Sequence, residues 1–135
     1  MNSIAYIPGV WDLLHVGHIT ILEHAKTLCD RLVVGVPSDD VVKEDKGKYP
    51  VISLQDRVRM LSALRCVDAV LPYYRLEFLT NLEIIRPDIF VVGEKWGVSK
   101  RHKEAEEWLY QNEGKFVILP YYRYESTSAI KQRVR

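Results

Sequence analysis

The chain alternates between two spacings of apolar residues. Segments at helical spacing separate short runs that are apolar almost throughout, as buried parallel strands are. Within 18–29, Ile21, Leu22, Ala25 and Leu28 fall on one helical face. Strands are predicted at 3–7, 31–36, 69–72, 87–93 and 115–120. Helices are predicted at 18–29, 53–64, 76–85, 103–114 and 128–134.

This alternation predicts an α/β fold. Strand and helix alternate five times without an internal repeat or linker, so we expect one Rossmann-like, doubly wound domain over 1–135 with a five-stranded, mainly parallel sheet. Sheets of this kind bind ligands beyond the carboxyl ends of their strands. The segments that follow the strands are therefore the places to look for a site, namely 9–18, 37–50, 93–102 and 121–128.

The segment 37–53 is predicted to be a loop, because it is polar and contains Gly47 and Pro50. Its only apolar residues before position 50 are Val41, Val42 and Tyr49. With so little area to bury, the segment is cheap to disorder. We expect it to be mobile when the site is empty and to close over bound ligands.

Composition and charge exclude several classes of partner. The 135 residues carry a net charge of +1, which predicts no nucleic-acid partner and only local phosphate recognition. The two cysteines, Cys29 and Cys66, lack metal-like spacing and read as buried thiols of a reducing, cytoplasmic protein. The N-terminus has no secretory pattern. No apolar run approaches the ~20 residues that span a bilayer, so no membrane insertion is expected.

The stretch GVWDLLHVGH at 9–18 carries the most distinctive chemistry. His15 and His18 lie where a strand meets a helix, and free N–H groups at a helix start favour phosphate. Gly17 lets a ligand approach the backbone, and Asp12 could orient a histidine or reach Mg²⁺. The G-x-G-x-x-G spacing of NAD-binding folds is absent. A zinc site of His15, His18 and Asp12 is a weaker alternative, since no further ligand motif supports it.

The same stretch resembles the G-x-F-D-x-x-H-x-G-H signature of the cytidylyltransferases, within the nucleotidylyltransferase superfamily. The segments DRLVVGVPSDD, DRVRMLSALRCVDAVLP, PDIFVVGEKW and VILPYYRYESTSAIK follow in the family's order and spacing. The resemblance covers nearly the whole chain. It is strongest to the glycerol-3-phosphate cytidylyltransferases.

The resemblance implies a reaction without a covalent enzyme intermediate. It implies transfer of CMP from CTP to a small phosphorylated alcohol such as glycerol 3-phosphate, giving the CDP-linked product and pyrophosphate. It also implies Mg²⁺ as the cofactor and a homodimer as the assembly. An adenylyltransferase that acts on a sugar phosphate of the heptose-phosphate type is one alternative. A nucleotide-binding module without catalysis is another.

The resemblance also implies roles for individual residues. The expected catalytic residues are His15, His18, Lys46 and Arg123. The expected nucleotide-binding residues are Gly9, Val10, Trp11, His15, His18, Arg123, Ser126 and Thr127. The expected substrate-binding residues are Lys48, Arg57, Arg65 and Trp96. Asp12 is the expected Mg²⁺ ligand.

Plainer roles stay open for several of these residues. Lys46 and Lys48 could be solvated surface lysines, and Arg65 could form a surface ion pair. Trp96 could pack in a core or a subunit contact. Two departures from the family pattern, Val10 and the shortened RYESTS segment, leave the nucleotide base and the acceptor undecided.

Overall fold

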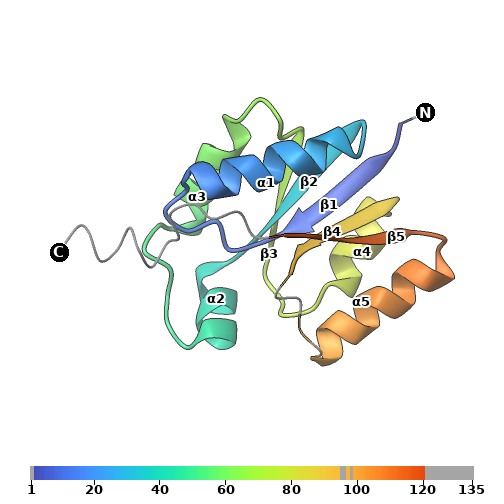
Figure 1. Ribbon diagram of the computed structural model, residues 1–135. Helices are drawn as coiled ribbons and strands as arrows, with labels where there is room; N and C mark the ends of the chain where they lie inside the picture. The colour runs from blue at the N-terminus through green and yellow to red at the C-terminus, as the bar shows by residue number, and fades with distance from the viewer. Residues whose placement is uncertain (1, 95–96, 98, 121–135) are drawn as a thin grey trace.

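A computed structural model describes residues 2–94, 97 and 99–120 of the chain. Five strands form one sheet in the order β3-β2-β1-β4-β5, and every adjacent pair is parallel (Figure 1). The predicted α/β fold with a five-stranded parallel sheet is therefore confirmed. The helix predicted over 128–134 lies outside the described residues.

The strands and helices of the described residues follow the predicted order, with one additional helix at Asp39–Lys46. The strands are Ile4–Pro8 (β1), Arg31–Pro37 (β2), Ala69–Tyr73 (β3), Ile89–Gly93 (β4) and Lys115–Leu119 (β5). The helices are Val16–Thr27 (α1), Asp39–Lys46 (α2), Leu54–Ser62 (α3), Leu79–Ile85 (α4) and Lys100–Gln111 (α5). Within the described ranges, no helix combines the length and apolar character needed to cross a bilayer.

The sheet is covered by helices on both faces, with α1 and α3 on one face and α4 and α5 on the other (Figure 1). Each face has its own apolar cluster. Leu22 of α1 and Leu61 of α3 pack in the first, and Leu82 of α4 and Trp108 of α5 pack in the second. Burial of these side chains is the main force that holds the helices on the sheet.

The segment predicted as a loop contains helix α2, and the loop prediction is wrong there. The Ser38 hydroxyl caps the helix by accepting the Val41 N–H at 3.2 Å. Val41 and Val42 are each 4% exposed, and Gly47 ends the helix with φ at 87°. A cap, two buried valines and a left-handed glycine thus order a stretch that composition alone marks as polar.

The strand order reverses between β1 and β4. From β1 the chain moves outward to β2 and β3 on one side, and β4 and β5 then fill the other side. In a doubly wound sheet this reversal opens a crevice at the carboxyl ends of the two central strands. The loops that follow β1, β2, β3 and β4 meet around this crevice, so it is the expected place for a site.

Candidate active site

The loop after β1 is sharply bent around a tryptophan. Trp11 and Leu13 have φ angles of 57° and 50°, a left-handed conformation that costs a non-glycine residue about 1–2 kcal/mol. The Trp11 indole Nε1–H holds the bend by donating to the Gly35 carbonyl at 3.0 Å. A Cβ on Gly9 would lie 2.8 Å from the same indole, so this position requires glycine. Trp11, a predicted nucleotide contact, is therefore part of the core.

Asp12 anchors this loop to the segment before α3. Its two carboxylate oxygens accept the N–H groups of Val51 and Ile52, each at 2.9 Å. The residue is buried, and both oxygens are oriented toward protein donors. The described residues contain no group of three His, Cys, Asp or Glu side chains that could hold a metal ion. The geometry therefore makes Asp12 a positioning residue and gives no support to a role as a Mg²⁺ ligand.

Arg57 anchors the same loop from α3. The residue is 1% exposed, and its guanidinium donates to the carbonyl groups of Ile52, Val10 and Pro37, each at 2.9 Å. It also donates to the Asp39 carboxylate at 2.7 Å. These bonds use four of the five guanidinium N–H donors. The predicted substrate contact of Arg57 is therefore not supported, because the side chain is bonded to protein.

Helix α1 begins at two stacked histidines. The ring centroids of His15 and His18 are 3.9 Å apart, with 26° between the ring planes. His15 Nδ1 accepts the Gly17 N–H at 3.1 Å, and His18 Nδ1 accepts the His15 N–H at 3.2 Å. Together they form a reciprocal capping box. Both rings are therefore oriented by the backbone of the helix start.

These bonds also fix where each ring carries its proton. A nitrogen that accepts an N–H is unprotonated, so the neutral ring of His15 or His18 carries its proton on Nε2. Burial, and next to it the neighbouring His15, lower the pKa of His18 to about 4, while Asp12 opposes the shift. His18 is therefore neutral at pH 7 and has one Nε2–H to donate.

The start of α1 is suited to hold an anion. Its first turn contains no acidic residue, and the positive end of the helix dipole favours negative charge there. The Nε2–H groups of His15 and His18 lie on the ring side opposite the backbone bonds. The two predicted histidines thus supply paired, pre-oriented donors at a helix N-terminus, which is an arrangement that fits phosphate.

A cavity of about 350 Å³ adjoins this loop. That volume is within the usual range for a small-molecule site. It is bounded by the carboxyl ends of β1, β2, β3 and β4, at Pro8, Pro37, Tyr73 and Gly93. Gly9 and Val10, both predicted nucleotide-binding residues, line the same cavity. The cavity therefore lies at the reversal of the strand order. It borders the first two residues of the histidine loop, the segment 9–18 that carries His15 and His18, but neither histidine lines it.

The structure separates the predicted basic residues. Lys46, the last residue of α2, lines the cavity, and its Nζ lies 3.8 Å from the Asp45 carboxylate. Lys48 is exposed beyond the end of α2 and is not part of the cavity lining. Arg65 is exposed in the connection that enters β3, at the amino-terminal edge of the sheet. Arg65 is therefore not part of this cavity, and its predicted substrate contact gains no support from the structure.

Four predicted site residues lie outside the described residues. They are Trp96, Arg123, Ser126 and Thr127. Their roles in binding the nucleotide and the substrate stay predictions.

Sequence reasoning missed five polar or aromatic residues of the cavity, Asp45, Tyr73, Phe78, Arg101 and His102. Arg101 and His102 lie in 93–102, one of the segments after a strand where a site is expected. In the sequence, however, they stand between Lys100 and Lys103 and resemble the exposed start of a helix. Asp45 was hidden because α2 was expected to be a loop. A helix prediction for α2 would have placed its last turn at the carboxyl edge.

Comparisons with known proteins agree with this architecture. A family model described as cytidylyltransferase-like matches residues 6–133. The bifunctional protein HldE of Koribacter versatilis is 41% identical over 110 residues, which cover 79% of this chain and 23% of that protein. The bifunctional protein HldE of Streptomyces coelicolor is 40% identical over 135 residues, covering 98% of this chain and 28% of that protein. The chain spans about a quarter of the length of these curated relatives.

Solved structures of other proteins share this architecture. A lipopolysaccharide core biosynthesis protein from Thermoplasma volcanium superposes with a TM-score of 0.75 at 26% identity, over 93% of this chain and 100% of that one. Pantoate-beta-alanine ligase from Francisella tularensis, at 20% identity and a TM-score of 0.64 over 91% of this chain and 60% of that one, shares the fold. The family model supports an enzyme of the nucleotidyltransferase type. With the family model matching almost from end to end, the chain belongs to the cytidylyltransferase-like family.

Proposed function

We propose that this protein is a nucleotidyltransferase that transfers AMP from ATP to a sugar phosphate of the heptose-phosphate type. The observation that carries the transfer chemistry is the stacked pair His15 and His18, whose Nδ1 atoms accept backbone N–H groups at the start of α1. The neutral His18 ring presents an Nε2–H donor, and the loop that carries both histidines borders a cavity large enough for a small phosphorylated acceptor.

The choice of ATP and a sugar phosphate is supported by the comparisons. The matching curated relatives share the name HldE, which favours the heptose-phosphate adenylyltransferase alternative over the glycerol 3-phosphate one. The structural neighbour described as a lipopolysaccharide core biosynthesis protein agrees with a sugar acceptor. The cytidylyltransferase reading, with CTP and glycerol 3-phosphate, becomes the second candidate to be tested.

The proposed reaction is a single displacement at the α-phosphorus of the nucleotide. An oxygen of the acceptor phosphate forms a bond to the α-phosphorus, and the bond from that phosphorus to the bridging oxygen of the β-phosphate breaks. Pyrophosphate leaves with the electron pair, and no proton has to move to the enzyme. His15 and His18 would donate to phosphoryl oxygens that gain charge in the transition state. Lys46 at the cavity would face the incoming acceptor.

Mg²⁺ is proposed as part of the nucleotide substrate. Because the Asp12 oxygens are bonded to Val51 and Ile52, the described residues do not fit a resident Mg²⁺ centre. A triphosphate binds Mg²⁺ through its own oxygens. We expect EDTA to abolish turnover and added Mg²⁺ to restore it, whereas full activity in EDTA would contradict this proposal. A homodimer is proposed from the family resemblance alone, and a cytoplasmic location from the spacing of Cys29 and Cys66.

Pyrophosphate release across a matrix of substrates tests the proposal. ATP, CTP, GTP and UTP are each combined with a heptose phosphate or with glycerol 3-phosphate, in the presence of Mg²⁺. Release with ATP and the heptose phosphate is expected. Release only with CTP and glycerol 3-phosphate would establish the second candidate. Nucleotide binding without release on any acceptor would identify a binding module.

A further inference from the structure

The rim of the cavity holds an ion-pair group that the histidine loop does not explain. Arg101, in the first turn of α5, donates from Nη2 to the Asp45 carboxylate of α2 at 3.2 Å. The Nζ of Lys46 lies 3.8 Å from the same carboxylate oxygen. All three side chains line the cavity. One carboxylate is thus placed between two cations from two separate helices, at the mouth of a site for phosphorylated ligands.

Arg101 is held in a defined orientation but retains donors for a ligand. Its guanidinium carbon lies 4.9 Å from the centroid of the Phe78 ring, and its side chain is 19% exposed. Within the described residues its guanidinium makes one hydrogen bond, to Asp45. An arginine has five N–H donors. The contact with Phe78 and the bond to Asp45 hold the guanidinium at the cavity, so the remaining donors need little further ordering to bind an anion.

The neighbouring His102 adds a polar group without adding charge. Its ring stacks on Phe78 with 6.0 Å between centroids, and its Nδ1 lies 2.9 Å from the Ser99 hydroxyl oxygen. Burial, and next to it the charge of Arg101, lower the pKa of His102. The positive charge of the rim is therefore that of Arg101 and Lys46. Asp45 offsets one of these two charges when no ligand is bound.

The proposed reaction needs cations at this position. Two phosphate groups must approach each other, and their repulsion opposes in-line attack. The histidines at α1 are suited to the nucleotide, so the acceptor phosphate needs its own positive partners. The cavity extends from Gly9 and Val10, next to the histidine loop, to Lys46 and Arg101 at the rim. An acceptor that fills it would contact Lys46 and Arg101 at one end and approach Gly9 and Val10, in the loop that leads to His15 and His18, at the other.

We propose that Arg101, with Lys46, binds the phosphate-bearing acceptor, and that Asp45 holds Arg101 in place until the acceptor anion replaces it. This inference rests on the proposed function and deepens it by naming a residue that selects phosphorylated acceptors. Arg101 leaves the Asp45 carboxylate and donates to the acceptor anion. The Phe78 ring keeps the guanidinium at the cavity in both states.

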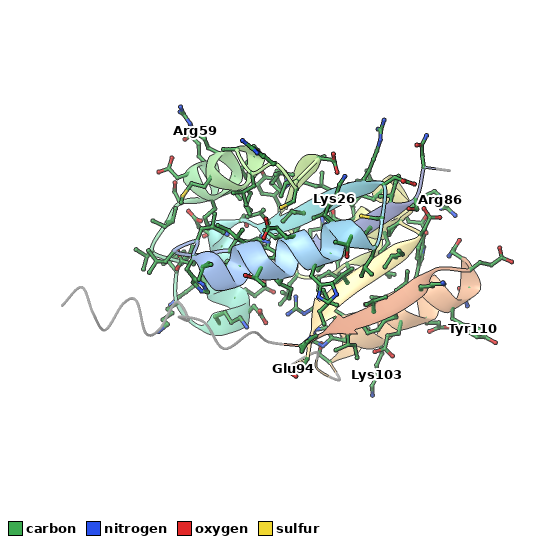
Figure 2. All side chains as sticks on the ribbon, turned by 45° about the horizontal axis from the view of Figure 1, so that its top comes forward. Lys26, Arg59, Arg86, Glu94, Lys103 and Tyr110 are labelled. Atoms are coloured by element: carbon green, nitrogen blue, oxygen red, sulfur yellow. The ribbon has the colours of Figure 1, made fainter. Side chains whose placement is uncertain are left out.

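The test compares two variants of Arg101 with a control on the same helix. Arg101→Ala removes the guanidinium donors, and Arg101→Lys keeps the positive charge but lacks the forked guanidinium group. Lys103→Ala is the control, because Lys103 is exposed and points away from the body of the molecule (Figure 2). Binding of inorganic phosphate and of a heptose phosphate is measured by calorimetry, and KM is measured for the acceptor and for ATP. Thermal melts establish that each variant is folded, and Arg101→Gln replaces Arg101→Ala if the latter is not.

The expected result is a loss confined to the acceptor. Arg101→Ala should weaken acceptor binding and raise the acceptor KM by about 10- to 100-fold, the usual effect of losing a hydrogen bond to a charged group. The KM for ATP should stay within about threefold, Arg101→Lys should be intermediate, and Lys103→Ala should match the parent protein. An acceptor KM and affinity in Arg101→Ala equal to those of Lys103→Ala would overturn the inference.

The two proposals fail in different ways. If the parent protein releases no pyrophosphate with any pair of substrates, the proposed function fails. Calorimetry then still tests Arg101 through the binding of inorganic phosphate and the heptose phosphate. If the parent protein turns over but binds these anions no better than Arg101→Ala does, only the present inference fails. No binding of either anion by the folded parent protein at millimolar concentration would also overturn it.

Discussion

Arg57 and Arg101 both lie near the carboxyl edge of the sheet, but in opposite environments. Arg57 is 1% exposed and is surrounded by three carbonyl groups and one carboxylate. The side chain of Arg101 is 19% exposed and has a single carboxylate and an aromatic ring beside it. The number of protein acceptors therefore separates an arginine that holds the loop together from one that can bind a ligand. Position within a motif does not make this distinction.

The largest expected effect is the loss of stability when the hydrogen bonds of the buried Arg57 are removed. Arg57→Met keeps the apolar stem but leaves the carbonyl groups of Val10, Ile52 and Pro37 and the Asp39 carboxylate without their donor. Losing a buried charged partner of this kind costs about 3–5 kcal/mol. Urea unfolding followed by circular dichroism measures the loss. Arg59→Met is the matched control, since Arg59 is exposed on the same helix and points outward (Figure 2). Equal stability of the two variants would contradict the positioning role of Arg57.

The second effect concerns turnover rather than stability. His18→Ala removes an Nε2–H donor that acts mainly on charge developing in the transition state, so kcat should fall by about a hundredfold or more while the nucleotide Kd changes little. His24→Ala, in the last turn of the same helix, is the control and should keep normal turnover. Near-normal kcat in folded His18→Ala protein would remove the histidine from the proposed mechanism.

Local patterns were sufficient to predict the sheet and the histidine loop. Strand β2 is apolar nearly throughout, and Leu22 and Ala25 of the predicted face of α1 are buried, whereas Leu28 at the end of that face is exposed. The pair His15 and His18 was identified because chain neighbours three apart at a helix start must lie on one side of it. These features depend on contacts that are close in sequence.

Features that depend on distant contacts could not be predicted in this way. Arg57 was assigned to the substrate because nothing in the sequence reveals that its acceptors come from three other segments. The pair Asp45 and Arg101 is 56 residues apart in the chain and forms only because α2 and α5 flank one crevice. Helix α2 itself was missed because two valines in a charged stretch are weak evidence until the sheet they pack on is known.

The third expected effect is a pH dependence of the protein's stability that is set by His18. Its pKa in the folded protein is about 4, below the ordinary value of 6.5, mainly because the ring is buried and next because His15 lies against it. The unfolded chain therefore binds a proton that the folded protein does not, over the range between these two values. The stability that neutral His18 contributes is fully present above about pH 6.5 and is lost as the pH falls toward 4.

Unfolding in urea at pH 7 and at pH 5 measures this loss. His18 should contribute less than about 2 kcal/mol to the difference, since about 1.5 pH units of the range are crossed. In His18→Gln the side chain no longer titrates but can still reach the N-cap backbone, as glutamine does in a capping box. The variant should therefore lose less stability than the parent protein between the two pH values. An equal loss in both proteins would assign the pH dependence to other groups.

The smallest expected effect is the coupling energy between each of the two arginines and its carboxylate partner. Arg101 and Asp45 are both partly exposed, so a double-mutant cycle with Arg101→Met and Asp45→Asn should give a coupling energy below about 1 kcal/mol. The same cycle for Arg57 and Asp39 should give a larger value, because the arginine side chain of that pair is fully buried. A weak pair is also what ligand exchange requires, since an acceptor anion has to displace Asp45 from Arg101. Strong coupling at Arg101 together with weak coupling at Arg57 would reverse the comparison and make Arg101 the structural residue.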